Sequence, residues 1–226
     1  MWYKKLSTPL SVNCSLNLAI MSVTILTLMS PTAYTAEIDL PEELQALLVE
    51  KPAIVDDFNL VDQYKKPFTR DRLKNKWTFV FFGYTNCPDV CPTTMAEIDN
   101  AAARLKKLND SRNDIQYVFV SIDPGRDTPE HLAEYVSYFT TPFIATTGEE
   151  SELKKFATPL RVGFRVGFKT ESTYFMDHGA SMILIDPEAR YYARFRPPHY
   201  SEEIVSRFKS IMDYRSQIKN ASVQNK

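Results

Sequence analysis

The stretch FFGYTNCPDVCPTTMAEI places two cysteines between an apolar run and an amphipathic run. Residues Trp77–Phe82 are aromatic or β-branched, which predicts a buried strand. Residues Thr93–Leu108 repeat apolar side chains at the spacing of one helix face, which predicts a helix. Cys87 and Cys91 therefore lie where a buried strand gives way to a helix N-terminus. This junction restricts the fold, because the strand has to end and the helix has to begin within a few residues of both sulfurs.

The remaining pattern alternates strands with helices and then ends in a hairpin and a helix. It predicts, in order, a strand over Gln116–Ile122, a helix over Pro129–Phe139, a short strand over Phe143–Thr146, a helix starting at Ser151, a hairpin of Ser181–Asp186 with Tyr191–Phe195, and a closing helix over Tyr200–Tyr214. Asp127 or Thr128 is expected to cap the helix that starts at Pro129. This order predicts an α/β, thioredoxin-like fold with a mixed central sheet and helices on both faces.

The spacing of the two cysteines leaves three interpretations open: a structural disulfide, a redox couple, or two ligands of a metal. Three residues, Pro88, Asp89 and Val90, separate Cys87 from Cys91, whereas a thioredoxin redox motif has two. If part of the loop is helical, the two thiols lie on one helix face and can converge on a third partner. A disulfide across so short a loop would stabilise little. A helix N-terminus stabilises a thiolate and lowers its pKa, which favours redox or metal chemistry.

A metal site needs a further ligand, and the chain offers His131, His178 and His199. His178 precedes a predicted buried strand across Gly179, whereas the other two histidines are expected at the surface or near helix starts. Two thiolates and one imidazole suit Cu(I) and can also hold Cu(II), although zinc could use the same set with water. The thioethers of Met176 and Met182 flank His178 as candidate auxiliary donors, although core packing is the commoner role of methionine.

The N-terminus differs in composition from the rest of the chain. Lys4 and Lys5 precede the uncharged stretch Leu16–Met29, and an acidic stretch follows, which predicts export with the N-terminus left in the cytoplasm. The segment either is cleaved or anchors the chain, so the protein is expected to be membrane-anchored or soluble in a bacterial periplasm. Cys14 lies at the edge of this segment and is interpreted as incidental, which leaves an even pair of thiols in the exported part.

Length and charge set the domain organisation and exclude one class of partner. A chain of 226 residues fits one domain with extensions. We assign residues 1–36 to a signal peptide or membrane anchor, 37–49 to a linker, 50–216 to the thioredoxin-like domain and 217–226 to a polar tail. The net charge is −1 and the basic residues are dispersed, which excludes a nucleic-acid partner.

Three motifs in register resemble the SCO/SenC family of copper proteins: GYTNCPDVCPTTMAEI, VSIDPGRDTPEHLAEY and DHGASMILIDPEARYYARF. The resemblance covers about residues 50–215 and implies a thioredoxin-like domain that binds one copper ion, Cu(I) or Cu(II), through Cys87, Cys91 and His178. It departs at Asn86, where many members have histidine. Asp123 and Arg126 in the second motif are expected to form a strand-to-helix turn, with contact to the site or to a partner as the alternative.

The resemblance also implies a function and partners. Such proteins help to assemble the dinuclear copper centre of cytochrome c oxidase, by delivering copper to the copper-bearing subunit, by reducing its cysteines, or by both. A copper metallochaperone is therefore the leading hypothesis, with other copper donors or thiol reductants as further partners. The alternative is an exported thiol–disulfide oxidoreductase that uses only Cys87 and Cys91, for which His178 would be dispensable. A peroxide-reducing relative ranks last, because the sequence offers no separate feature for it.

Overall fold

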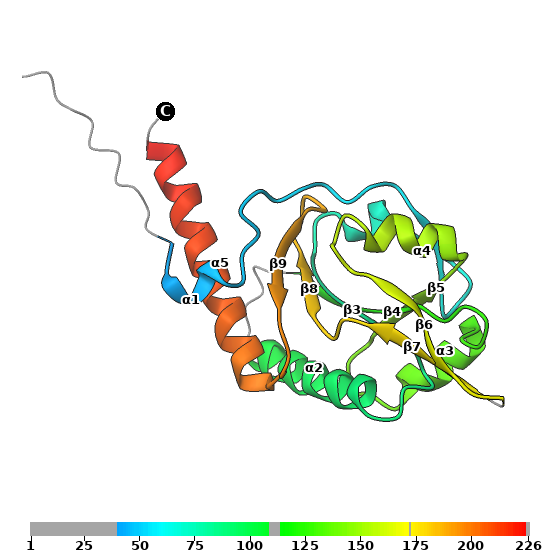
Figure 1. The fold of residues 1–226 in the computed structure, drawn as a ribbon. Helices are drawn as coiled ribbons and strands as arrows, with labels where there is room; N and C mark the ends of the chain where they lie inside the picture. The colour runs from blue at the N-terminus through cyan, green and yellow to red at the C-terminus, as the bar shows by residue number, and fades with distance from the viewer. Residues whose placement is uncertain (1–39, 109–113, 172, 225–226) are drawn as a thin grey trace, which may run out of the picture. The chain divides into compact units, whose positions relative to one another are not determined.

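The computed structural model describes residues 40–108, 114–171 and 173–224 (Figure 1). Its helices are α1 Glu42–Gln45, α2 Val90–Lys107, α3 Pro129–Ser137, α4 Glu150–Ala157 and α5 Ser201–Gln224, with a 3₁₀ turn, η1, at Arg70–Leu73. Its strands are β1 Asn59–Asp62, β2 Pro67–Thr69, β3 Trp77–Gly83, β4 Ile115–Ser121, β5 Ile144–Thr147, β6 Phe164–Lys169, β7 Tyr174–His178, β8 Met182–Ile185 and β9 Tyr191–Phe195. The predicted export segment and Cys14 lie outside the described residues. Among the described residues, no helix is both long enough and apolar enough to cross a membrane.

The main sheet has seven strands in the order β2-β1-β5-β4-β3-β8-β9. β3 pairs parallel with β4 and antiparallel with β8, so the sheet is mixed as predicted. Every residue of β3 is buried, because this central strand is covered on both faces. Side chains alternate along it: Phe79 contacts Phe208 of α5, and Phe82 contacts Phe156 of α4. Helices therefore cover both faces of the sheet, with α2 and α5 packed together on the side opposite α4 (Figure 1).

The structure adds strands that the sequence patterns did not predict. β1 and β2 form an antiparallel pair, and β1 extends the main sheet beyond β5. At the opposite edge, Leu48 forms a bridge to Ala193 of β9, and Ile54 forms one to Arg190 just before β9, so this edge strand is partly covered. The segment assigned to a linker includes α1 and contributes Leu44 and Leu47 to the buried core.

β6 and β7 form a separate two-stranded antiparallel sheet, which the sequence patterns also did not predict. We call Phe164–His178 the β6–β7 hairpin. It extends away from the main sheet (yellow in Figure 1). Its last residue, His178, comes shortly before β8 enters the main sheet at Met182. The hairpin therefore carries the predicted histidine ligand at the end that joins the main sheet.

The final helix is longer than the apolar pattern predicts. α5 continues past Tyr214 to Gln224, so most of the residues assigned to a polar tail are helical. The last fully buried side chain of the helix is Ile211, which explains why the apolar pattern ends early. Residues 215–224 contain neither glycine nor proline, so nothing in their composition stops the helix.

Candidate metal centre

The two predicted cysteines lie on either side of the start of α2. β3 ends at Gly83 and α2 begins at Val90, so Cys87 is in the loop and Cys91 is in the first helical turn. Neither forms a disulfide. The backbone N–H of Cys91 donates to the Cys87 sulfur at 3.4 Å. The condition for pairing along one helix face is not met, because α2 starts after Cys87 and the loop brings the two residues together.

The Cys91 thiol is fully buried beside the end of β3. A Cβ atom on Gly83 would lie 2.9 Å from the Cys91 sulfur and 2.8 Å from the Phe119 ring, so glycine leaves the room that the sulfur occupies. Burial raises the pKa of the Cys91 thiol well above its usual range. The expectation that the helix N-terminus lowers this pKa is wrong for Cys91, because removal from water disfavours the thiolate more than the helix favours it.

His178 lies across from Cys91. Its Nε2 atom is 3.7 Å from the Cys91 sulfur, and its Nδ1 atom is 3.1 Å from the Gly179 carbonyl oxygen. Because a carbonyl can only accept, Nδ1 holds the proton and Nε2 presents a lone pair towards the thiol. Burial lowers the pKa of the imidazole, which keeps it neutral. The ring edges of Phe81 and Tyr84 flank it and restrict its orientation.

A cleft of about 550 Å³ opens between the cysteine loop and β7. Cys87, Met176 and His178 line it, together with Tyr84, Pro88, Asp89, Val90, Phe175, Asp177 and Ala180. Burial alternates along β7, so Met176 is on the same strand face as His178. Met182 is fully buried within β8 and does not line the cleft. Of the two methionines, Met176 is thus the one placed as a possible soft donor.

The other two histidines are placed elsewhere. His131 lies on α3, and its Nδ1 atom is 3.3 Å from the Arg126 carbonyl oxygen. His199 donates from Nε2 to the Ala180 carbonyl oxygen at 2.7 Å. Neither lines the cleft. Within the described part of the chain, no three His, Cys, Asp or Glu side chains already converge as a closed set of metal ligands.

Sequence reasoning missed the residue that anchors the cysteine loop. Asp127 is fully buried, and its carboxylate accepts from the Thr85 N–H at 3.0 Å, the Thr85 hydroxyl at 2.5 Å and the Ser121 hydroxyl at 2.5 Å. The sequence offers Asp127 as one of two possible caps for α3, but Thr128 performs that role by accepting from the His131 N–H. In the sequence, the only indication of this role is that a charged residue stands next to the capping position. The contact of Asp127 with Thr85 is visible only in the fold, because the two residues are far apart along the chain.

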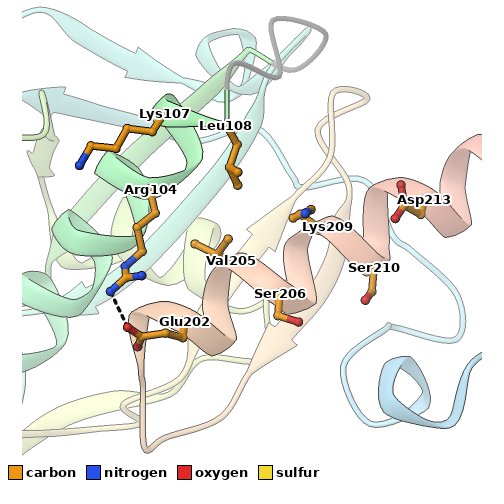
Figure 2. A pocket seen from close by; sticks show the side chains of 9 residues that line it. All are labelled: Arg104, Lys107, Leu108, Glu202, Val205, Ser206, Lys209, Ser210 and Asp213. Carbon is orange, nitrogen blue, oxygen red and sulfur yellow. Dashed lines mark hydrogen bonds and ion pairs between the residues drawn. The ribbon is translucent and has the colours of Figure 1, made fainter.

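A second groove, larger than the cleft at the cysteines, lies elsewhere in the structure. It lies between α2 and α5 (Figure 2), has a volume of about 670 Å³, and includes Arg104, Lys107 and Glu202 among its lining residues. Arg104 pairs there with Glu202. None of the groove's lining residues is a thiol or an imidazole. The smaller cleft is therefore where these two donor types meet.

The fold is thioredoxin-like, with two free thiols at a strand–helix junction and an imidazole that lies against one of them. These features define a class of proteins that carry out thiol chemistry or bind a metal. The SCO1/SenC family model matches residues 48–213. The chain belongs to the SCO1/SenC family, which confirms the resemblance seen in the sequence.

Curated relatives and solved structures agree with this assignment. The chain is 36% identical over 163 residues to an SCO2-like protein of Rickettsia prowazekii, covering 71% of this chain and 78% of the relative. The structure of Arabidopsis thaliana ScoI with copper bound has a TM-score of 0.66 and 33% identity, covering 72% of this chain and all of that one. The copper-bound structure of Bradyrhizobium japonicum ScoI has a TM-score of 0.61 and 36% identity, covering 70% and 98%.

Proposed function

We propose that this protein is a copper metallochaperone that holds one copper ion through Cys87, Cys91 and His178 and helps to assemble the dinuclear copper centre of cytochrome c oxidase. The observation that carries the proposal is the 3.7 Å approach of the His178 Nε2 lone pair to the Cys91 sulfur. The free thiol of Cys87 lines the same cleft as His178. Family membership and the copper-bound relatives support copper as the metal.

The donor set fits copper held as a transferable cargo. Two thiolates and a neutral imidazole are soft ligands that suit Cu(I). Because the three side chains do not yet converge in the described structure, binding requires them to close on the metal together. Both thiols must also lose their protons when they bind, so uptake releases protons. The Cys87 side chain is partly exposed, which gives an acceptor's ligands a route by which to replace it.

The proposal is tested by anaerobic titration of the reduced protein with Cu(I) against a competing chelator. The wild type is compared with His178→Ala, with the Cys87→Ser/Cys91→Ser double variant, and with His131→Ala as the matched control. We expect one tightly bound copper ion that is lost in the double variant. Loss of groups that merely orient metal ligands costs about 10–100-fold in affinity, so His178→Ala should cost roughly tenfold or more. Binding indifferent to His178 would contradict the proposed ligand set.

A second function is favoured by the unequal exposure of the two thiols. Cys87 is partly exposed, whereas Cys91 is buried beside it. In a thiol–disulfide exchange, the Cys87 thiolate would attack the acceptor's disulfide and release one acceptor thiol. Cys91 would then attack the mixed disulfide, release the second thiol and leave a Cys87–Cys91 disulfide, for which another exported thiol reductant would restore the two electrons.

The two functions separate in single-cysteine variants. Incubation of Cys91→Ser with the oxidised copper-bearing domain of cytochrome c oxidase should accumulate a mixed disulfide, whereas Cys87→Ser should not. His178→Ala should leave the exchange rate of the otherwise intact protein unchanged. Equal trapping by both single variants, or none by either, would remove the support for this second function.

We infer that the protein acts outside the cytoplasm, either membrane-anchored or soluble in the periplasm. The basic head and the uncharged stretch Leu16–Met29 support this. An alkaline phosphatase fusion after residue 40 should be active in a bacterial host. A charged substitution in the centre of the stretch, Ile20→Arg, should abolish that activity, and an active Ile20→Arg fusion would contradict the assignment.

A further inference from the structure

Among the described residues, the hairpin that presents His178 has no strand pairing with the main sheet. In that part of the chain β6 and β7 pair with each other, whereas β8 pairs with β3 directly after the hairpin. One end of β7 is therefore tied to the core through the short connection to β8. The orientation of the other end, at Tyr174, depends on side-chain contacts.

Three side chains make these contacts, and we call Asp123, Arg126 and Tyr174 the hairpin clasp. The Tyr174 hydroxyl donates to Asp123 Oδ1 at 2.7 Å, and Arg126 Nε donates to Asp123 Oδ2 at 2.5 Å. Arg126 Nη1 donates to the Tyr174 carbonyl oxygen at 3.0 Å. The Arg126 guanidinium carbon also lies 3.7 Å from the centre of the Tyr174 ring, which adds a cation–π contact.

The clasp is shielded from water. The side chains of Asp123 and Arg126 are 3% and 20% exposed, so their interaction is screened less than a surface ion pair. Arg126 also lies 5.8 Å from the Tyr84 ring, and the Tyr84 ring meets the His178 ring edge-on. The clasp is thus linked to the site both along β7 and through Tyr84.

The geometry of β7 connects the clasp to the histidine. Tyr174, Met176 and His178 are every second residue of β7, and all three lie on its less exposed face. At about 3.3 Å of rise per residue, Tyr174 lies roughly 13 Å along the strand from His178. The clasp touches neither cysteine nor His178, so it acts on the site indirectly, by fixing the rotation and position of the strand and through the Tyr84 ring.

We propose that the hairpin clasp is a positioning device that holds the His178 imidazole against the cysteine pair. This inference rests on the proposed function. When the clasp is intact, β7 is fixed at both ends and Nε2 is held at its short distance from the Cys91 sulfur. When the clasp is broken, the hairpin pivots about its connection to β8, and His178 spends less time within reach of a metal held by the thiols.

The test is a double-mutant cycle between Tyr174→Phe and His178→Ala, read as Cu(I) affinity of the full chain. Tyr174→Phe removes the hydroxyl that donates to Asp123 but keeps the ring beside Arg126. We expect it to weaken Cu(I) binding by roughly tenfold, as loss of ligand-orienting groups does, and to have no further effect in the His178→Ala background. Tyr138→Phe is the matched control, because Tyr138 is exposed on the surface after α3.

A readout on the metal-free protein separates positioning from general stability. Diethyl pyrocarbonate should modify His178 faster in Tyr174→Phe than in wild type, with His131 as the internal reference and at a temperature well below the thermal midpoint of both proteins. Arg126→Gln, which breaks two clasp hydrogen bonds at once, should give the same result and serves if Tyr174→Phe does not fold. Equal losses of copper affinity in both backgrounds of the cycle, or unchanged His178 modification, would overturn the clasp. Failure of the wild type to bind copper would instead overturn the proposed function.

Discussion

Gly83 gives the Cys91 sulfur its place in the core. A Cβ atom at this position would lie 2.9 Å from that sulfur and 2.8 Å from the Phe119 ring, and both neighbours are fully buried. A methyl group would therefore push the sulfur or the ring out of place. We expect Gly83→Ala to lower the free energy of unfolding by about 1–3 kcal/mol, as overpacking does, and to weaken copper binding.

Urea unfolding and Cu(I) competition would measure both effects. Gly163→Ala is the matched control, because a Cβ atom there meets nothing within 4 Å. It should leave copper affinity unchanged. If Gly83→Ala binds copper as tightly as the wild type, the space that Gly83 leaves for the Cys91 sulfur does not constrain the site.

Among single residues, the sequence suggested which side chains to consider but not their environment. The cysteine spacing selected Cys87 and Cys91, and the position before a buried strand and the family resemblance selected His178. The structure places Cys91 and His178 in contact, and the set of three as metal ligands stays a prediction. The direction of the Cys91 pKa shift was predicted wrongly, because spacing along the chain does not reveal how deeply a thiol is buried. Tyr174 had no signal in the sequence, since its partners are distant along the chain.

The cysteine loop is an element held by one buried carboxylate. Asp127 accepts both donors of Thr85, and Thr85 lies two residues before Cys87. Asp127→Ala would leave these buried or partly buried donors without an acceptor, which costs about 1–3 kcal/mol of stability. The loop would also hold Cys87 less firmly, so we expect copper affinity to fall roughly tenfold.

The neighbouring cap provides the control for this variant. Thr128→Ala removes the α3 cap, at a cost of about 1 kcal/mol, without touching the cysteine loop. Denaturant unfolding and Cu(I) competition on both variants would separate the effects. If the two variants lower copper affinity equally, Asp127 acts through stability alone and the loop anchor is refuted.

Elements with strong periodicity were predicted, and those held by distant contacts were missed. β3, α2, β4, α3 and the β8–β9 hairpin match runs of buried strand residues or one-faced helix patterns. Most residues of β6 are exposed, so this strand lacks the run of buried apolar side chains that predicts a strand from sequence. β1 is short and is defined by its pairing with β5, which lies far along the chain.

At the scale of the whole molecule, the class of fold follows from element order, but the path of the chain does not. The alternation of strands and helices predicted a mixed sheet covered on both faces, and the sheet confirms it. The position of β1 beside β5 and the separation of β6–β7 from the main sheet depend on long-range pairing. The cleft exists because that separate hairpin meets the cysteine loop, so its shape could not be derived from local patterns.

The stability of the whole molecule should depend on pH through His199. Its Nε2–H donates to the Ala180 carbonyl oxygen, and burial, with a further contribution from the positive charge of Arg207, lowers the pKa of the ring. The unfolded chain takes up a proton near pH 6.5, whereas the folded chain takes it up only at a lower pH. The free energy of unfolding should therefore fall as the pH drops below about 6.5 and level off below the folded pKa.

Urea unfolding of the metal-free protein between about pH 8 and 5 would measure this dependence. His199→Gln keeps a side-chain amide that can donate to Ala180 but cannot titrate, so its stability should fall less over the same range. Burial shifts the pKa of His178 in the same direction, but that residue is present in both proteins and its contribution cancels in the difference. Parallel pH profiles for wild type and His199→Gln would show that His199 protonates equally in the folded and unfolded chains, which would contradict the argument from burial.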